Sequence, residues 1–393
     1  MSQPTCWFRA CSAMAILAAA SAGSATGQDA AATTSAPSQA VAGVTETILA
    51  EAPQAAEPYS VVLSADRRHV AFAVQRGERH FAVVDGREGQ GYDQLGRQGI
   101  LFSPDGKRSA YAARKGKKWV LVLDGKESRE YDGLGGLSFS PDGVRLICAA
   151  QVGQNAYVLT NGKEGKAYGG VGGLTFSPDG KRLAYMAVKY GRRVVVVDGK
   201  EVGPYDAVGS IVFSPDGKRL ALAVVKNGKW SIVLDGKQGG KAYDGIAGLL
   251  FSPDGKRLAY KGLMARRQVM VFDGREHKKG YDRIDSITLS PDGNRVAYVG
   301  WRADKAVVVA DGKEGETYDS VVGLTFTPDG QRVAYGAQKG SKWRVVAAGR
   351  ASPEYDEVFK QRSGLLFDGP NRCRFLAGKD GKWVLVEMDL PRP

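Results

Sequence analysis

Seven aspartates recur in one short turn motif, and their number and spacing are the first feature of the chain that suggests chemistry. Six stand in Ser-Pro-Asp-Gly and one in Thr-Pro-Asp-Gly, at steps of 37 or 38 residues. Carboxylates in such number could act as general acids and bases or hold calcium. A repeat of this period instead predicts one supersecondary unit copied many times. The seven are Asp105, Asp142, Asp179, Asp216, Asp254, Asp292 and Asp329.

Comparison of the copies with one another favours a structural role for the aspartates. A second set fills an Asp-Gly turn later in each unit, but the third unit has Asn161-Gly162 there and the eighth has Ala348-Gly349. Asn-Gly retains the positive-φ turn and discards the carboxylate. A Tyr-Asp pair also recurs, and the third unit replaces it with Tyr168-Gly169. We therefore interpret these positions as requiring a backbone shape and not an acid.

The residues of one unit predict four short antiparallel strands, labelled A to D in chain order. In residues 207–244, apolar runs cover Val208–Phe213, Arg219–Val225 and Trp230–Leu234, and turn residues separate them. Runs of this length, rich in Val, Leu and aromatic residues, are typical of strands. A lone sheet of this size leaves two apolar faces exposed, and radial stacking of copies buries them.

Tryptophans and cysteines add to the expectation of packing between units. Cys148 and Cys373 belong to B strands six units apart, so we expect two small buried hydrophobes and no disulfide. Four tryptophans open C strands, and a fifth stands in the equivalent strand region of its own unit. Their periodic placement predicts burial between neighbouring units. These tryptophans are Trp119, Trp230, Trp343, Trp383 and Trp301.

The turn motif and the run after it resemble the WD40-like propeller repeats of the TolB type, over about residues 60–390. The resemblance implies an all-β fold with a single closed β-propeller of four-stranded blades. Nine A–B hairpins can be counted, so we expect eight or nine blades, with nine favoured. Thr45–Ala50 or Glu57–Tyr59 could supply a strand that closes the ring. The residues that carry the resemblance are Phe176-Ser177-Pro178-Asp179-Gly180-Lys181-Arg182-Leu183-Ala184-Tyr185 and their copies.

The first 58 residues differ in composition from the repeats. Residues 1–27 predict a secretory signal, with Arg9, an apolar core over Ser12–Ala22 and small residues before a cleavage point. An uncleaved anchor is the alternative. Residues 28–58 are rich in Ala, Ser, Thr and Pro and predict a flexible linker before the propeller of residues 59–393. We expect a periplasmic or secreted protein without a membrane span in its mature form.

The net charge favours an acidic partner. The chain carries +13, and residues 1–58 hold one Arg against four acids, so the remainder carries +16. A field of this sign attracts an acidic polymer, anionic headgroups or an acidic protein. Export makes nucleic acid the weaker candidate. A plain solvated surface is the alternative interpretation.

Spacing gives the candidate site. From the Tyr of the Tyr-Asp pair to the aromatic residue of strand A is 8 residues in most units, but 10 before Phe102 and 12 before Phe367. Insertions in repeat proteins tend to lie on the binding face. We therefore expect enlarged loops before blades 2 and 9 to form a cationic pocket near the channel mouth. Loops that merely complete the ring are the alternative. The predicted binding residues are Arg97, Gln98, Lys360 and Arg362.

Two other basic surfaces compete with this pocket. Lys-Arg pairs such as Lys181-Arg182 follow the A–B turns and predict a ring of solvated hairpin tips. The B–C loops are basic as well and vary more between units, as Arg114–Lys118 and Arg266-Arg267 illustrate. A recognition surface and ordinary hairpin tips are both compatible with that pattern.

Short catalytic and metal motifs are absent from the sequence. It holds no Gly-x-Ser-x-Gly elbow, no Walker loop and no Cys-x-x-Cys pair, so we expect no catalytic residues, metal site or cofactor. Its histidines are His69, His80 and His277, without metal-ligand spacing. We predict an exported, monomeric scaffold that binds a protein or acidic polymer in a bacterial envelope. The alternatives are a lyase or hydrolase acting on an anionic glycan and a structural envelope protein.

Overall fold

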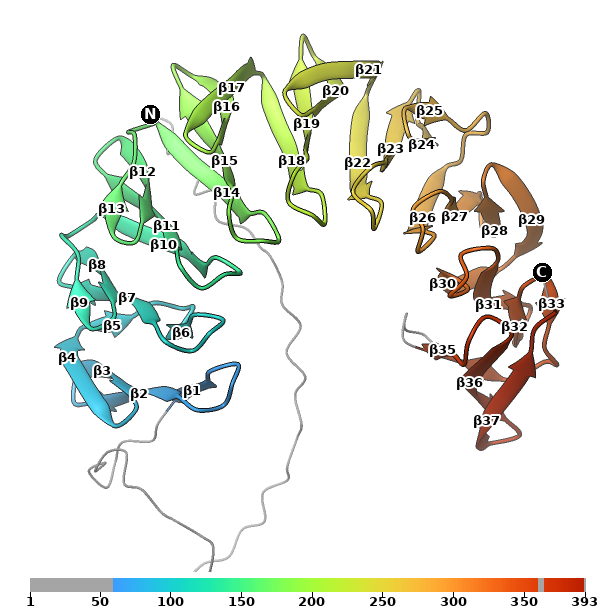
Figure 1. Cartoon of the computed structure of the whole chain (residues 1–393), viewed down its shortest axis with the longest axis horizontal. Helices are drawn as coiled ribbons and strands as arrows, with labels where there is room; N and C mark the ends of the chain where they lie inside the picture. The colour runs from blue at the N-terminus through green and yellow to red at the C-terminus, as the bar shows by residue number, and fades with distance from the viewer. Residues whose placement is uncertain (1–58, 360–363, 392–393) are drawn as a thin grey trace, which may run out of the picture. The chain divides into compact units, whose positions relative to one another are not determined.

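The computed structural model describes residues 59–359 and 364–391, and their regular elements are β-strands (Figure 1). The predicted signal, residues 1–27, and the predicted linker, residues 28–58, lie outside this range. So do Thr45–Ala50, whereas Tyr59 begins the first strand. Of the described residues, none belongs to a helix long and apolar enough to cross a membrane.

Nine antiparallel sheets follow one another along the described chain, and we number them 1 to 9 (Figure 1). Strands A to D of each sheet pair in chain order, except where noted. Sheet 1 comprises β1 (Tyr59–Leu63), β2 (Val70–Arg76), β3 (Arg79–Val84) and β4 (Arg87–Tyr92). Sheet 2 comprises β5 (Gln94–Leu95), β6 (Leu101–Phe102), β7 (Ser109–Lys115), β8 (Lys118–Leu123) and β9 (Lys126–Glu127). Sheet 3 comprises β10 (Gly133–Phe139), β11 (Leu146–Val152), β12 (Asn155–Thr160) and β13 (Lys163–Glu164).

Sheets 4 to 6 contain the most regular units. Sheet 4 comprises β14 (Gly170–Phe176), β15 (Leu183–Lys189), β16 (Arg192–Val197) and β17 (Lys200–Tyr205). Sheet 5 comprises β18 (Ala207–Phe213), β19 (Leu220–Lys226), β20 (Lys229–Leu234) and β21 (Lys237–Tyr243). Sheet 6 comprises β22 (Gly245–Phe251), β23 (Leu258–Met264), β24 (Arg267–Phe272) and β25 (Arg275–Glu276). The strands predicted over residues 207–244 are confirmed within one or two residues.

Sheets 7 and 8 have strands A to D, whereas sheet 9 has no strand D in the described residues. Sheet 7 comprises β26 (Arg283–Leu289), β27 (Val296–Arg302), β28 (Lys305–Ala310) and β29 (Lys313–Tyr318). Sheet 8 comprises β30 (Ser320–Phe326), β31 (Val333–Lys339), β32 (Lys342–Ala347) and β33 (Arg350–Ala351). Sheet 9 comprises β34 (Glu357–Val358), β35 (Leu365–Phe367), β36 (Arg372–Lys379) and β37 (Lys382–Asp389), with β34 and β35 both paired to β36.

The repeated aspartates shape the A–B turns, as the sequence predicts. In sheet 4 the Ser177 hydroxyl donates to Asp179 at 2.5 Å, and Asp179 accepts the amide of Lys181 at 3.1 Å. Gly180 follows with φ of 73°, which a glycine adopts without strain. The Ser177 hydroxyl and the Lys181 amide hold the pKa of Asp179 below its ordinary range. These carboxylates are therefore committed to their own turns.

The C–D turns use a side-chain oxygen as well as a backbone shape. Asp198 has φ of 49°, accepts the Leu183 amide at 2.9 Å and pairs with Arg182 Nε at 2.9 Å. Asn161 makes the equivalent bond to the Leu146 amide at 2.8 Å. Ala348 retains the positive φ of 53° without that acceptor. The expectation that backbone shape alone matters was therefore incomplete.

Buried clusters join each sheet to the next. Between sheets 6 and 7, Tyr281 and Tyr298 lie edge to face, 5.8 Å apart, among fully buried aliphatic side chains. The Tyr281 hydroxyl donates to Glu314 of sheet 7 at 2.6 Å. Burial and this acceptor raise the pKa of Tyr281. The tyrosine of the Tyr-Asp pair is therefore a bridge between sheets, and eight such clusters hold nine sheets together.

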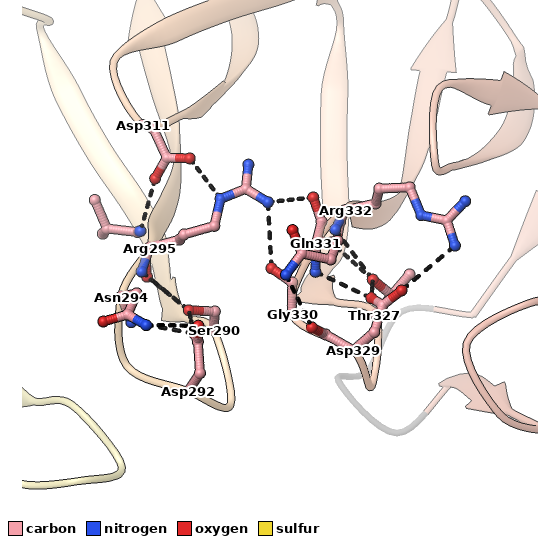
Figure 2. Close-up of polar contacts among 11 residues, drawn as sticks. Ser290, Asp292, Asn294, Arg295, Asp311, Thr327, Asp329, Gly330, Gln331 and Arg332 are labelled. Carbon is pink, nitrogen blue, oxygen red and sulfur yellow. Dashed lines mark hydrogen bonds and ion pairs between the residues drawn. The ribbon is translucent and has the colours of Figure 1, made fainter. Parts of the chain in front are cut away.

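Arginines after the A–B turns also link neighbouring sheets, as Figure 2 shows for sheets 7 and 8. Arg295 Nε donates to Asp311 of its own sheet at 2.6 Å, and its Nη1 donates to the carbonyls of Gly330, at 3.2 Å, and Gln331. Its guanidinium also lies over the ring of Phe326, 5.6 Å from the centroid. The interpretation of these arginines as solvated hairpin tips was wrong, because each reaches across to the next sheet.

The cysteines and most tryptophans follow expectation. Cys148 and Cys373 are free and buried, and burial raises the pKa of Cys148 to about 12. Trp301 lies in strand B, not strand C, which corrects its assignment. Trp383 is 64% exposed, so its predicted burial between units is wrong in the described structure.

Candidate partner-binding surfaces

The insertion in sheet 2 interrupts strand A and does not lengthen the D–A connection. β5 ends at Leu95 and β6 begins at Leu101, and both pair with β7. The intervening turn is held by the Gly99 amide, which donates to the Gly96 carbonyl at 2.9 Å. Ile100 is buried beneath it. The predicted enlarged loop is thus a bulge on the free edge of strand A.

The two predicted binding residues in this bulge differ in their contacts. Gln98 bonds to both backbone groups of Leu137 in sheet 3, with Oε1 at 2.9 Å and Nε2 at 3.2 Å. Its amide is therefore used to fix the bulge to the next sheet. Arg97 is exposed and, in the described ranges, has no ion pair or side-chain hydrogen bond. Of the pair, Arg97 is the group left for a ligand.

The second half of the predicted pocket lies in sheet 9. Its strand A is also split, between β34 and β35, so the longer spacing before Phe367 again marks an interruption of strand A. Lys360 and Arg362 lie outside the described residues, so the pocket that joins them to Arg97 and Gln98 stays a prediction. The sequence spacing located both interruptions, but not their position within a strand.

Basic residues at the B–C turns are mostly paired within the molecule. Lys118 pairs with Asp132 at 2.5 Å, and Lys342 pairs with Asp356 at 2.6 Å. Asp132 also accepts the amide of Gly153 at 2.7 Å, which caps the neighbouring turn. The aspartate of the Tyr-Asp pair therefore neutralises the start of strand C. This reduces the charge that the B–C surface can offer to a partner.

Shallow pockets recur where neighbouring sheets meet on the side of the A–B and C–D turns. One of about 320 Å³ lies between sheets 7 and 8, with Lys313 at its rim and Tyr335 among its apolar walls. A second of about 260 Å³ lies between sheets 5 and 6, with Lys237 and Lys256. A third of about 300 Å³ lies between sheets 4 and 5. Each could hold a small group beside a cation.

The carboxylates near these pockets already have partners. Glu314 accepts from Tyr281 and pairs with Lys279 at 2.7 Å and with Arg302 at 2.5 Å. Arg302, Lys279 and the Tyr281 hydroxyl lower the pKa of Glu314 to about 2 against the opposing effect of burial. Such an anion is a poor proton donor near neutral pH. Within the described ranges, no group of three or more His, Cys, Asp or Glu could hold a metal ion.

Comparison with known proteins gives structural similarity without a family. No protein-family model and no curated protein matches the chain. A eukaryotic initiation factor aligns at 13% identity with a TM-score of 0.40, over 79% of this chain and 92% of that one. TolB from Acinetobacter baumannii aligns at 14% identity with a TM-score of 0.29, over 64% of this chain and 80% of that one. The Dos1 propeller aligns at 11% identity with a TM-score of 0.35, over 74% of this chain and 92% of that one.

These similarities concern the arrangement of strands and not the chemistry of any surface. All three TM-scores are below 0.5, so the fold class rests on the described strands and not on these similarities. Membership of the TolB-type repeat family stays a prediction. None of the solved proteins bears on what this chain binds.

One recurrent group of cations was not among the predicted site residues. A Lys or Arg follows the C–D turn and opens strand D in each of sheets 1 to 8. An alignment of the repeats on the C–D turn would have revealed these cations, because a basic residue directly follows the turn glycine in sheets 1 to 8.

Proposed function

We propose that this chain is an exported β-propeller scaffold, closed as one ring of nine blades, that binds an acidic protein or polymer in a bacterial envelope. The observation that carries the proposal is the pairing of acids. Most acidic side chains in the described ranges pair with a neighbour, yet the repeats retain a surplus of +16. That surplus lies on exposed lysines and arginines, which favours association with negative charge.

The proposed site combines the two interruptions of strand A. Arg97 supplies a free cation in sheet 2, Gln98 fixes its bulge, and Lys360 and Arg362 add two cations in sheet 9. In a closed nine-blade ring these sheets are two apart, so the two bulges would approach one channel mouth. The pocket would be cationic and would bind by charge without covalent chemistry.

Binding of the purified full-length protein to immobilised polyuronate and polyglutamate tests the proposal. We expect retention at 50 mM salt and its loss at 500 mM, because salt screens contacts between exposed charges. Arg97→Glu should weaken retention more than Lys107→Glu, an equal charge change in the same sheet. No retention on either polymer would refute an acidic partner. Equal effects of the two variants would refute the site and leave the scaffold role intact.

Export has its own test. The protein should be recovered from the periplasm or medium with a new N-terminus near Gln28 when it is expressed in a Gram-negative host. Retention of residues 1–27 on a membrane-bound product would favour the anchor. A cytoplasmic product that begins at Met1 would overturn export altogether.

A further inference from the structure

Four positions in the repeat are basic in most copies, and at three of them most of the cations have a partner within the molecule. The arginine after the A–B turn links two sheets, as Arg182 does. The cation at the end of strand B pairs with a glutamate in five sheets, as Lys189 does with Glu201 at 2.6 Å. The cation at the start of strand C pairs with the Tyr-Asp aspartate, as Lys229 does with Asp244 at 2.6 Å. An internal contact therefore accounts for most of the cations at these three positions.

The fourth position, the first residue of strand D, has no such explanation. It is Lys or Arg in every one of sheets 1 to 8, and all eight side chains are exposed. In the part of the chain that is described, seven have no ion pair or side-chain hydrogen bond, and Arg350 donates only to the Asp389 carbonyl at 3.2 Å. We call these residues the D-strand cations: Arg87, Lys126, Lys163, Lys200, Lys237, Arg275, Lys313 and Arg350.

A neighbouring position shows how an unconstrained solvent-facing site behaves. The residue after Asp-Gly in the A–B turn is equally exposed, and it is Lys in sheets 2, 4, 5 and 6. It is Val144 in sheet 3, Asn294 in sheet 7 and Gln331 in sheet 8. The copies therefore accept apolar and neutral polar residues at this exposed position. Eight cations, none of them in an ion pair in the described structure and none replaced by a neutral residue, indicate a constraint from outside the molecule.

The D-strand cations lie above the junctions between sheets. Lys313 is the cross-strand partner of Ala310, whose side chain packs against sheet 8. Lys237 is likewise opposite Leu234, which packs against sheet 6. Cross-strand partners share one face, so these two cations lie on the face toward the next sheet. Lys313 and Lys237 accordingly line the pockets of about 320 Å³ and 260 Å³.

The D-strand cations recur at a regular interval, as the charges of a linear polymer do. Within the described residues, their surroundings lack the aromatic platforms that bind nucleic acid and most of the apolar anchors that bind protein. Stacked sheets lie about 10 Å apart, so one cation recurs at about that interval or slightly more. Single-stranded nucleic acid needs aromatic platforms. The strongly exposed aromatic residues of the described chain are Tyr190 and Trp383, both at the opposite, B–C edge. A protein partner needs apolar anchors, and in the described residues the large exposed apolar side chains at or beside these turns are Val144 and, before the first turn, Leu63.

We propose that the D-strand cations bind a linear acidic polysaccharide, whose carboxylates engage successive lysines and whose sugar rings rest at the junction pockets. The inference depends on the proposed acidic partner and gives it a second contact surface, on the edge of the A–B and C–D turns, in addition to the strand A bulges. Contacts repeated along one polymer add through high effective concentration, so the affinity rises with polymer length.

A matched pair of quadruple variants tests the inference in the full-length protein. The first carries Gln at Lys126, Lys163, Lys200 and Lys237, and the second carries Gln at Arg67, Arg68, Lys107 and Lys181. Both remove four exposed charges from the edge of the A–B and C–D turns, and the second set lines none of the three pockets described above. The first variant should bind long polyuronate at least about tenfold more weakly, whereas the second should change affinity less than about threefold. Thermal unfolding should be nearly unchanged in both, because no D-strand lysine among the four has a side-chain partner.

The outcomes separate this inference from the proposed function. Equal losses in the two variants, or polyuronate affinity that is independent of chain length, would overturn the inference while leaving an acidic partner in place. Polyglutamate or single-stranded DNA that binds as tightly as polyuronate of equal charge would overturn the choice of polysaccharide. No binding of the unmodified protein to any of these would sink the proposed function itself.

Discussion

Both faces of sheet 9 carry apolar side chains, but these are buried on one face and exposed on the other. The face toward sheet 8 presents Cys373 and Phe375, which are buried with Ala334 and Val345 of that sheet. The other face presents Leu376 and Leu385, 54% and 62% exposed. Of the nine large apolar side chains that are strongly exposed in the described ranges, six belong to sheets 1 and 9. Both terminal sheets thus have the apolar composition of a face that packs against a neighbouring sheet.

The end sheets also carry the two halves of the arginine link. Arg372 Nε pairs with Asp389 at 3.0 Å, much as Arg182 pairs with Asp198 inside the array. Arg182 lies over Phe213, which precedes the turn serine of sheet 5, and in sheet 1 Leu63 holds that place. A junction from sheet 9 to sheet 1 would complete the pattern. Ring closure stays a prediction, and the following experiments compare interior junctions with the terminal faces.

Removal of a fully buried ring gives the largest effect. Phe375→Ala should lower the free energy of unfolding by about 3–5 kcal/mol, because the side chain is 1% exposed and a cavity would remain. Urea denaturation measures the change. A loss below about 1 kcal/mol would mean that sheet 9 is not packed on sheet 8 as described.

Truncation on the terminal face asks whether that face is covered in solution. If sheets 9 and 1 join, Leu385→Ala should cost at least about 2 kcal/mol, as for other buried leucines. Leu250→Ala in sheet 6, where the side chain is 38% exposed, is the control and should lower the free energy of unfolding much less. A negligible effect of Leu385→Ala would refute closure. A cost that grows with protein concentration would show that a second copy covers the face instead.

Loss of an arginine link has a smaller effect. Arg295→Gln removes the bond to Asp311 and weakens two bonds to sheet 8, and should cost about 1–2 kcal/mol, since charged hydrogen bonds are strong but this side chain is 30% exposed. Arg372→Gln at the end of the array is the matched change. Similar costs would support a closing junction, and a near-zero cost for Arg372→Gln alone would argue against it.

Acid should distinguish one interior junction from another. The pKa of Glu314 in the folded state is about 2, below its ordinary value near 4.3, so its contribution to stability is complete above pH 4.3 and disappears as pH falls toward 2. Tyr205 faces a junction where Gln238 replaces the glutamate. Glu314→Gln should therefore lower the urea midpoint at pH 7 and flatten its fall below pH 4. An unchanged acid profile would show that this pairing does not persist in solution.

The sequence predicted local structure well because the information is local. Turn residues such as Pro178 and Gly180 act within four positions, and the apolar runs fix the strands between them. The contacts between sheets were missed because they join residues about 35 apart. Yet they have a regular spacing, with Tyr281 and Glu314 separated by 33 positions, as are Tyr131 and Glu164. Covariation of such pairs among the copies could have been sought.

The candidate site was predicted less completely. Spacing alone located the interruptions of strand A, but a count of residues cannot show that Gln98 is committed to the backbone of Leu137. The D-strand cations were hidden for the opposite reason. In the sequence they resemble every other lysine after a turn, and only the partners of the remaining cations set them apart.

Because every link described here spans roughly one unit, cohesion of the array is a nearest-neighbour property. Tyr205-Asp206 and Tyr243-Asp244 close two successive units with the same residues, so the chain between them is interchangeable material. Gene duplication or excision at those seams would change the number of modules while each surviving neighbour kept its familiar surface. The architecture is thereby open to growth by copying, and its length is a variable that selection can adjust to the size of whatever it holds.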